Sequence, residues 1–235
     1  MTVPNPRPLA LALLLLATHI SRISSVVPTE ENTTEYNLLK LKSFWKGMGP
    51  GVAYPGKMLL TSDKLKEQRS LITTQEPFDL GEYFKMTIHV NFHVNNKESQ
   101  QSTFFALSSK DISPESLSPQ FNLLPLAERF SGLIIYLRDF DSMYVGTFDS
   151  NTFNENELVS RSKVCKISQR ENGFLSFEVT YQVGRLSVQV IENQDGSFRP
   201  CAQFSSFRFN DPMFISAGGA DDFGFAETAI RKATD

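Results

Sequence analysis

Apolar and polar residues alternate in short runs along the chain beyond residue 40. In MTIHVNFHV, residues 86–94, every second residue from Met86 to Val94 is apolar and the residues between are polar. A period of two indicates a β-strand with one buried face and one wet face. Similar runs predict further strands at residues 103–108, 132–138, 143–148, 174–181, 185–191, 202–209 and 213–219.

The connections between these runs favour an antiparallel arrangement. Three residues ending in Gly184 separate the runs 174–181 and 185–191, which predicts a hairpin. Residues 113–129 carry three prolines, so we expect an irregular excursion there rather than a stable helix. No linker divides residues 40–225. Many short strands of this kind predict an all-β domain, either a sandwich or a barrel.

Composition supports strands and excludes one class of partner. The chain has 235 residues with 20 phenylalanines and one tryptophan, and aromatic side chains pack well on pleated surfaces. Its 23 basic and 26 acidic residues give a formal charge of -3, without the broad basic face that a phosphate backbone requires. We therefore expect no nucleic-acid partner.

The N-terminus has the layout of a secretory signal peptide. Arg7 precedes an apolar segment of 12 residues, Leu9 to Ile20, followed by small and polar residues. A transmembrane helix needs about 20 apolar residues, so this segment is too short to span a bilayer. A buried core helix is the alternative, and it fits poorly with the polar residues that follow. We assign residues 1–25 to the signal and 26–37 to a polar segment, and we expect no direct membrane span.

Entry into the secretory pathway changes the interpretation of three residues. Cys165 and Cys201 are the only cysteines, and an even count in an oxidising compartment predicts one disulfide, which we place between neighbouring strands near one end of the domain. The bond would close the loop from Cys165 to Cys201, and the chain entropy that this removes from the unfolded state is worth about 4 kcal/mol of stability. Asn32 begins the only Asn-x-Ser/Thr sequon and is the predicted glycosylation site.

The sequence offers little for catalysis or metal binding. His89 and His93 would lie about 13 Å apart on a strand, so they cannot chelate one ion together. The chain has no nucleophile elbow, phosphate-binding loop, dinucleotide fingerprint or Glu-x-Asp-x-x-Glu triplet. We therefore expect a protein that is not an enzyme.

Two acidic stretches remain as candidate sites. In IYLRDFDS the apolar run ends at Arg138 and is followed by Asp139, Phe140, Asp141 and Ser142. In the second stretch, Gly218 and Gly219 precede a pair of aspartates, and glycines permit close backbone approach to a ligand. Taken alone, each stretch is more simply a solvated turn.

The order of motifs along the chain resembles the L-type, legume-lectin-like domains of secretory-pathway cargo receptors. The resemblance implies a concanavalin A-like sandwich of two antiparallel sheets over residues 38–228, with 229–235 as a tail. It also implies that the two cysteines frame the predicted hairpin. The matching motifs are SFWKGMGPGVA (43–53), LKEQRSLITT (65–74), FKMTIHVNFHV (84–94), GLIIYLRDFDS (132–142) and ISAGGADDFG (215–224).

The departures from the family concentrate at its working site. There the family binds Ca²⁺ through an Asp and an Asn, and mannose through an upstream Asp and a Gly-Gly backbone. By register Arg138 stands at that first Asp and Ser142 at the Asn. No carboxylate lies near residues 100–103, where the upstream acid belongs, and residues 149–158 lack the expected histidine. If the register slipped by one residue, Asp139 would become the first ligand, with Asp141 or Ser142 as its partner.

The resemblance implies a luminal lectin-like module that binds glycoprotein cargo or a receptor subunit. We expect it in the endoplasmic reticulum, in the Golgi or secreted, either soluble or docked on a membrane-anchored partner. The alternative is a sandwich domain that binds protein and no sugar. The predicted carbohydrate-binding residues are Asp139, Phe140, Asp141, Gly218 and Gly219. We predict no metal site, because a guanidinium at a ligand position repels Ca²⁺.

Overall fold

The computed structural model describes residues 45–49, 52–54, 57–59, 68–91, 101–112, 129–138, 141–167, 174–191, 197–221 and 229–231. All of them belong to one structural unit, Asn37–Asp235. The predicted signal peptide, the polar segment with Asn32, and His93 lie outside the described residues, as does the excursion except for Arg129. In the described part of the chain, no helix has the length and apolar character needed to cross a membrane.

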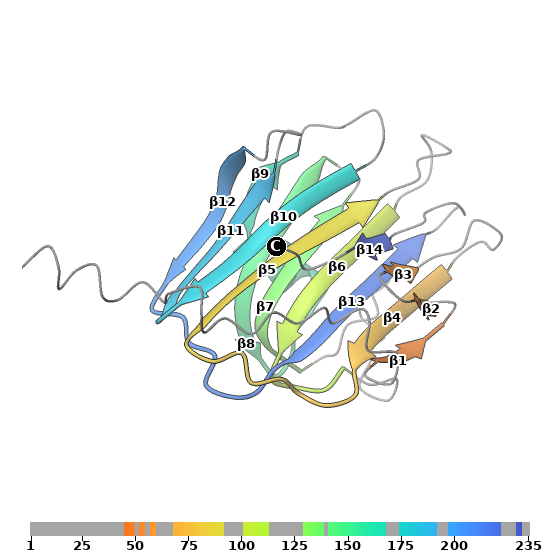
Figure 1. Ribbon diagram of the computed structural model, residues 1–235, viewed down its shortest axis with the longest axis horizontal. Helices are drawn as coiled ribbons and strands as arrows, with labels where there is room; N and C mark the ends of the chain where they lie inside the picture. The colour runs from red at the N-terminus through yellow and green to blue at the C-terminus, as the bar shows by residue number, and fades with distance from the viewer. Residues whose placement is uncertain are drawn as a thin grey trace, which may run out of the picture. The chain divides into compact units, whose positions relative to one another are not determined.

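Two seven-stranded sheets form the domain, which confirms the predicted antiparallel β-sandwich (Figure 1). Sheet A has the strand order β1-β4-β13-β6-β7-β8-β9, and sheet B has the order β12-β11-β10-β5-β14-β3-β2. The strands of sheet A are β1 (Trp45–Met48), β4 (Gln68–Thr74), β13 (Phe214–Asp221), β6 (Gln101–Ser108), β7 (Phe130–Arg138), β8 (Ser142–Ser150) and β9 (Lys163–Lys166). Those of sheet B are β12 (Phe198–Ser205), β11 (Arg185–Ile191), β10 (Phe174–Gln182), β5 (Tyr83–Asn91), β14 (Ala229–Arg231), β3 (Lys57–Leu59) and β2 (Val52–Tyr54).

The main core lies between the two sheets, because alternate residues of both sheets point toward each other. Sheet B contributes residues such as Ile88, Phe177 and Val188, and sheet A contributes residues such as Ile135 and Val145, all of them at most 2% exposed. The polar residues between them in sheet B face outward. This arrangement confirms the period of two predicted for residues 86–91.

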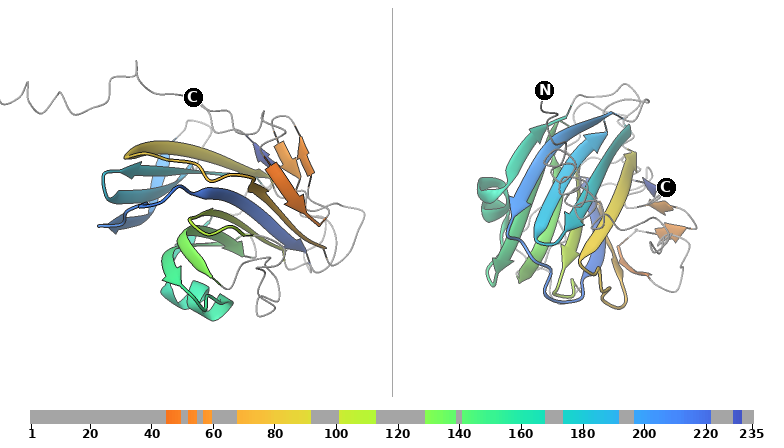
Figure 2. Two further views of the ribbon diagram at one scale, coloured as in Figure 1. Left: turned by 90° about the horizontal axis from the view of Figure 1, so that it is seen from below. Right: turned by 60° about the vertical axis from the view of Figure 1, so that its left-hand side comes forward.

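Sheet A is also buried on its outer face, where it carries a second apolar cluster. Helix α2 (Glu155–Arg161) contributes Leu158 to this cluster, and Phe153 stacks on Phe130 with ring centroids 5.1 Å apart. Figure 2 shows α2 on the side of sheet A that faces away from sheet B. The helix was not predicted, although Asn154 caps it by accepting a hydrogen bond from the backbone N–H of Glu157.

The predicted hairpin is confirmed, and its turn is tight. Gln182 pairs with Arg185, and both intervening residues have positive φ, 38° at Val183 and 80° at Gly184. Two positive φ values are typical of the type I′ turn, whose twist matches that of the flanking strands. Glycine adopts this conformation without strain, whereas a β-branched residue at Val183 does so at a cost.

Six of the described strands, β1, β2, β3, β4, β9 and β14, were not predicted from alternation, and most of the predicted strands differ from the structure by one to four residues at an end. The run 202–209 was expected to be one strand, but β12 begins at Phe198 and ends at Ser205. Ser206 has a φ of 66°, and Phe209 beyond it packs on Tyr181 with ring centroids 5.0 Å apart. The chain thus leaves the strand at Ser206, and the partly buried Phe209 packs against the core instead of continuing β12. At the C-terminal end, β14 pairs with β5 and β3, so part of the segment assigned to a tail, 229–235, belongs to sheet B.

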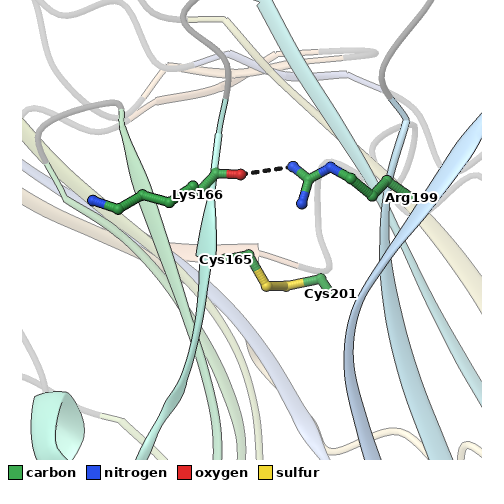
Figure 3. Close-up of a disulfide and its surroundings, with 4 residues drawn as sticks. All are labelled: Cys165, Lys166, Arg199 and Cys201. Atoms are coloured by element: carbon green, nitrogen blue, oxygen red, sulfur yellow. Dashed lines mark hydrogen bonds between the residues drawn. A yellow bond between two sulfur atoms is a disulfide. The ribbon is translucent and has the colours of Figure 1, made fainter.

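The predicted disulfide between Cys165 and Cys201 is confirmed, with a Cα–Cα distance of 5.5 Å. Its strands β9 and β12 lie side by side but belong to different sheets, so the bond joins the edge of sheet A to the edge of sheet B (Figure 3). Beside it, Arg199 donates a hydrogen bond of 2.6 Å to the backbone carbonyl of Lys166, and the Lys163 ammonium donates to that of Gln203.

Replacing both cysteines, Cys165→Ala with Cys201→Ala, is expected to lower the free energy of unfolding by about 2–4 kcal/mol, because the bond closes a long loop in the unfolded chain. Thermal unfolding followed by circular dichroism measures this change. Melting temperatures of the double variant and the parent that agree within error would contradict it.

Candidate functional site

Three of the predicted site residues, Asp141, Gly218 and Gly219, lie at one end of sheet A. β7 ends at Arg138, which pairs directly with Ser142 at the start of β8, and Asp141 is exposed in the turn that joins them. Gly218 and Gly219 lie in β13, two strands from β7, so about 10 Å separates their strands. Asp139 and Phe140 lie outside the described residues.

A lysine that the sequence did not indicate contacts this turn. The Lys166 ammonium lies 3.9 Å from a carboxylate oxygen of Asp141 and 3.3 Å from the hydroxyl of Ser142. The backbone of the same segment is tied down as well, because Ile167 donates a 2.8 Å hydrogen bond to the carbonyl of Asp141. Figure 3 shows the Lys166 side chain pointing away from the disulfide. The positive charge that faces the Asp141 carboxylate therefore comes from Lys166 of β9.

Pairing across the sheet places five polar residues in one row on the outer face. Arg138 pairs with Ser102 on β6 and with Ser142 on β8; Ser142 pairs with Lys166. Arg69 on β4 occupies the same row, since it and Ser102 both pair with Ala220. Residues that pair directly point to the same face of a sheet. We call Arg69, Arg138 and Lys166 the basic row.

Aromatic side chains lie next to the basic row on the same face. Phe104 and Tyr136 pair directly, Tyr136 pairs with Tyr144, and the two tyrosine rings have centroids 5.8 Å apart. Tyr136 is buried and its hydroxyl lies 3.2 Å from that of Ser102, whereas Tyr144 is partly exposed. The site thus consists of a row of cations and hydroxyls beside a floor of rings.

The structure gives Gly218 a packing role. A Cβ built on Gly218 would lie 2.3 Å from the Phe104 ring and 3.0 Å from the backbone oxygen of Ser70. The carbonyl of Gly218 accepts a 2.8 Å hydrogen bond from the Thr103 hydroxyl. Glycine is therefore required here for the ring to cover the strand, whether or not the backbone also contacts a sugar.

Two other titratable side chains, His89 and Glu178, are each engaged by a neighbouring residue of sheet B. His89 makes a 2.6 Å hydrogen bond with Ser176 on the outer face of sheet B. The buried Glu178 is paired with Lys85 at 2.8 Å. Among the described side chains, no three His, Cys, Asp or Glu residues come together as metal ligands do.

Sequence reasoning found Arg138 and Ser142 but missed Arg69 and Lys166. Lys166 could have been found from the cysteines, because the disulfide strand contains it one residue beyond Cys165. Its pairing with β8 could not, because the chain between β8 and β9 forms a helix whose length the pattern did not reveal. Arg69 lies far away in the sequence and joins the row only through β13.

The fold matches solved structures of lectin domains. Across 80% of this chain and 80% of theirs, the exoplasmic/lumenal domain of VIP36 in its Ca²⁺- and mannose-bound form superposes with a TM-score of 0.65 at 16% sequence identity. The carbohydrate recognition domain of Emp46p, in its metal-free form, has a TM-score of 0.63 at 17% identity and covers 86% of this chain and 91% of that chain.

A third solved structure also matches this fold. The legume lectin-like domain from Entamoeba histolytica has a TM-score of 0.61 at 14% identity, covering 81% of this chain and 87% of that chain. This chain has the legume-lectin-like fold. No protein-family model matches the sequence, and no curated protein is detectably similar to it. Sequence identities of 14–17% to these structures show a shared fold and do not by themselves show shared site residues.

Gly218→Ala is expected to lower the free energy of unfolding by about 1–3 kcal/mol, because the added methyl group overlaps the Phe104 ring. Urea unfolding of the purified protein measures the change. If the ring is the cause, Phe104→Leu in the same chain restores part of the lost stability, and the double-mutant cycle shows a favourable coupling. Additive effects of the two substitutions would rule the ring out.

Proposed function

We propose that this chain is a lectin-like binding module of the secretory lumen that binds a glycan of a glycoprotein, cargo or receptor subunit. The observation that carries the proposal is the legume-lectin-like fold, together with polar residues gathered at the end of β7 and β8, where the sequence resemblance locates the family's sugar site. The disulfide supports a luminal location, because such bonds persist in oxidising compartments.

We propose that binding does not use calcium. The VIP36 and Emp46p domains have each been solved in metal-free form, and VIP36 also in Ca²⁺-bound form, so the fold accommodates either state. Here the two positions that should supply Asp and Asn ligands hold Arg138 and Ser142, and Lys166 lies 3.9 Å from the Asp141 carboxylate. These residues do not fit Ca²⁺, which binds six to eight oxygens, several of them anionic.

The electrostatic penalty is large compared with typical binding energies. A divalent ion about 5 Å from a guanidinium is repelled by on the order of 7 kcal/mol at an effective dielectric constant near 20.

The second candidate is a sandwich domain that binds protein and no sugar. The observation that favours it is the same replacement of ligand groups, because Arg138 and Ser142 stand where the family has the Asp and Asn that bind Ca²⁺. In this case too the partner would be a luminal protein, either soluble or anchored in the membrane.

Glycan binding by the purified secreted chain separates the two candidates. We expect a subset of glycans on an array to bind equally well with calcium and with chelator. A glycan array on which nothing binds, together with capture of a specific luminal protein, would instead establish the protein-binding candidate. Binding that vanishes on chelation would contradict the calcium-free site.

Calcium is expected to leave the melting temperature unchanged. A ligand present at 100 times its dissociation constant stabilises a protein by about 2.7 kcal/mol, which corresponds to a rise of about 5–10 °C for a domain of this size. Differential scanning fluorimetry with millimolar calcium and with chelator should therefore give superimposed curves. The opposite result, a rise with calcium that is lost in Asp139→Ala but retained in the exposed-loop control Asp211→Ala, would restore a calcium site in this turn.

A further inference from the structure

The charged side chains described on the outer face of the strands of sheet A are all cations. Arg69, Arg138 and Lys166 form the basic row at one end, and Lys46 lies further along β1. Lys46 is held by Asp111 at 2.8 Å. Among the strand side chains that the structure describes on this face, none is aspartate or glutamate. The carboxylate of Asp141, in the turn at this end, lies 3.9 Å from Lys166. The three cations of the basic row outnumber it, so the row keeps a net positive charge.

The basic row is accessible and its members are close enough to act together. Arg138 and Lys166 are two strands apart and Arg69 is three strands from Arg138, distances of about 10 Å and 14 Å between backbones. The Lys166 side chain is 81% exposed, Arg69 is exposed and Arg138 is partly exposed. Long flexible side chains spaced in this way can converge on a ligand lying over Ser142.

The remaining groups of the site suit a sugar that carries a charge. Ser102 and Ser142 lie between the cations but are buried, and their hydroxyls contact the Tyr136 hydroxyl and the Lys166 ammonium, respectively. The partly exposed ring of Tyr144 lies beside the row. An aromatic face of this kind packs against the apolar face of a pyranose. A guanidinium fork binds carboxylate, sulfate or phosphate with two parallel hydrogen bonds, which no neutral sugar hydroxyl matches.

We propose that this end of sheet A binds an anionic glycan, in which a carboxylate, sulfate ester or phosphate ester is recognised by Arg138 and Lys166, with Arg69 adding to the positive field. The inference rests on the proposed function, because it names the class of glycan that the module binds. In this assignment Arg138, Lys166 and Arg69 supply the positive charge at the site, in place of a bound Ca²⁺.

The test measures binding of the purified chain, in chelator, to four immobilised glycans of matched density. These carry neutral high-mannose, sialic acid, 6-sulfated sugar and mannose 6-phosphate. We expect at least one of the three anionic glycans to bind more tightly than the neutral one, and the order among them identifies the anionic group. Binding is expected to weaken as the salt concentration rises from about 0.05 to 0.15 M, because salt screens exposed charges.

Charge-neutralising variants locate the site. Arg138→Gln is expected to weaken binding about tenfold or more, as expected for loss of a charge-assisted hydrogen bond. Lys166→Gln and Arg69→Gln alter exposed side chains and are expected to weaken binding by smaller factors while the protein stays folded. If Arg138→Gln does not fold, these two variants decide the question. Arg185→Gln is the matched control, because it removes one exposed positive charge from β11 of sheet B and should leave affinity unchanged.

Each outcome is decisive. Anionic preference that is lost in the variants of the basic row and kept in Arg185→Gln establishes the site. Binding of the neutral glycan alone overturns the inference and leaves the proposed function standing. Anionic binding that is indifferent to all three variants of the basic row overturns the location of the site. An absence of binding to any glycan overturns the proposed function and this inference together.

Discussion

Burial of sheet A on both faces is the constraint on which the rest of the structure depends. In β7, Leu133 and Ile135 enter the core between the sheets, while Ile134 and Tyr136 enter the cluster covered by α2. All four are 0% exposed. A strand buried on both faces has a continuous apolar sequence, so hydrophobicity alone does not distinguish one face from the other. Close contacts specify the register instead, such as the Phe104 ring over Gly218 and the Ser102–Tyr136 hydroxyl pair.

The same register determines the chemistry at the end of the strand. Tyr136 is buried on the outer face, so the next residue on that face is Arg138, at the point where the strand emerges into solvent. Antiparallel pairing then aligns Ser142 and Lys166 with it. A one-residue slip would exchange these side chains with those of the other face. The composition of the site is therefore a consequence of core packing two residues earlier in the strand.

Local alternation predicted eight of the fourteen described strands and, with the glycine-containing turn, the central hairpin, because each depends on nearby residues. The disulfide was predicted separately, because two cysteines in an oxidising compartment have only each other as partners. Local alternation did not reveal the end of β12, which depends on Phe209 contacting the distant Tyr181. For the candidate site, the sequence identified Arg138 and Ser142 through their place in a motif. It could not place Lys166 or Arg69 in the row, because each reaches the row through a different neighbouring strand, and strand order in a sheet is not encoded by local periodicity.

The edge strand β9 carries both the bonds that join the two sheets at one edge and a charged residue of the candidate site. This strand has four residues and one hydrogen-bonded neighbour, β8, so its own backbone pairing is weak support. Its inward residues, Lys163 and Cys165, attach it to β12 through a side chain–backbone hydrogen bond and the disulfide. Its outward residue, Lys166, reaches Asp141 and Ser142. Because alternate residues of a strand face opposite sides, the groups that fasten the edge do not compete with the cation for space. The disulfide thus fixes the position of a charged group that lies on the other face of the same four residues.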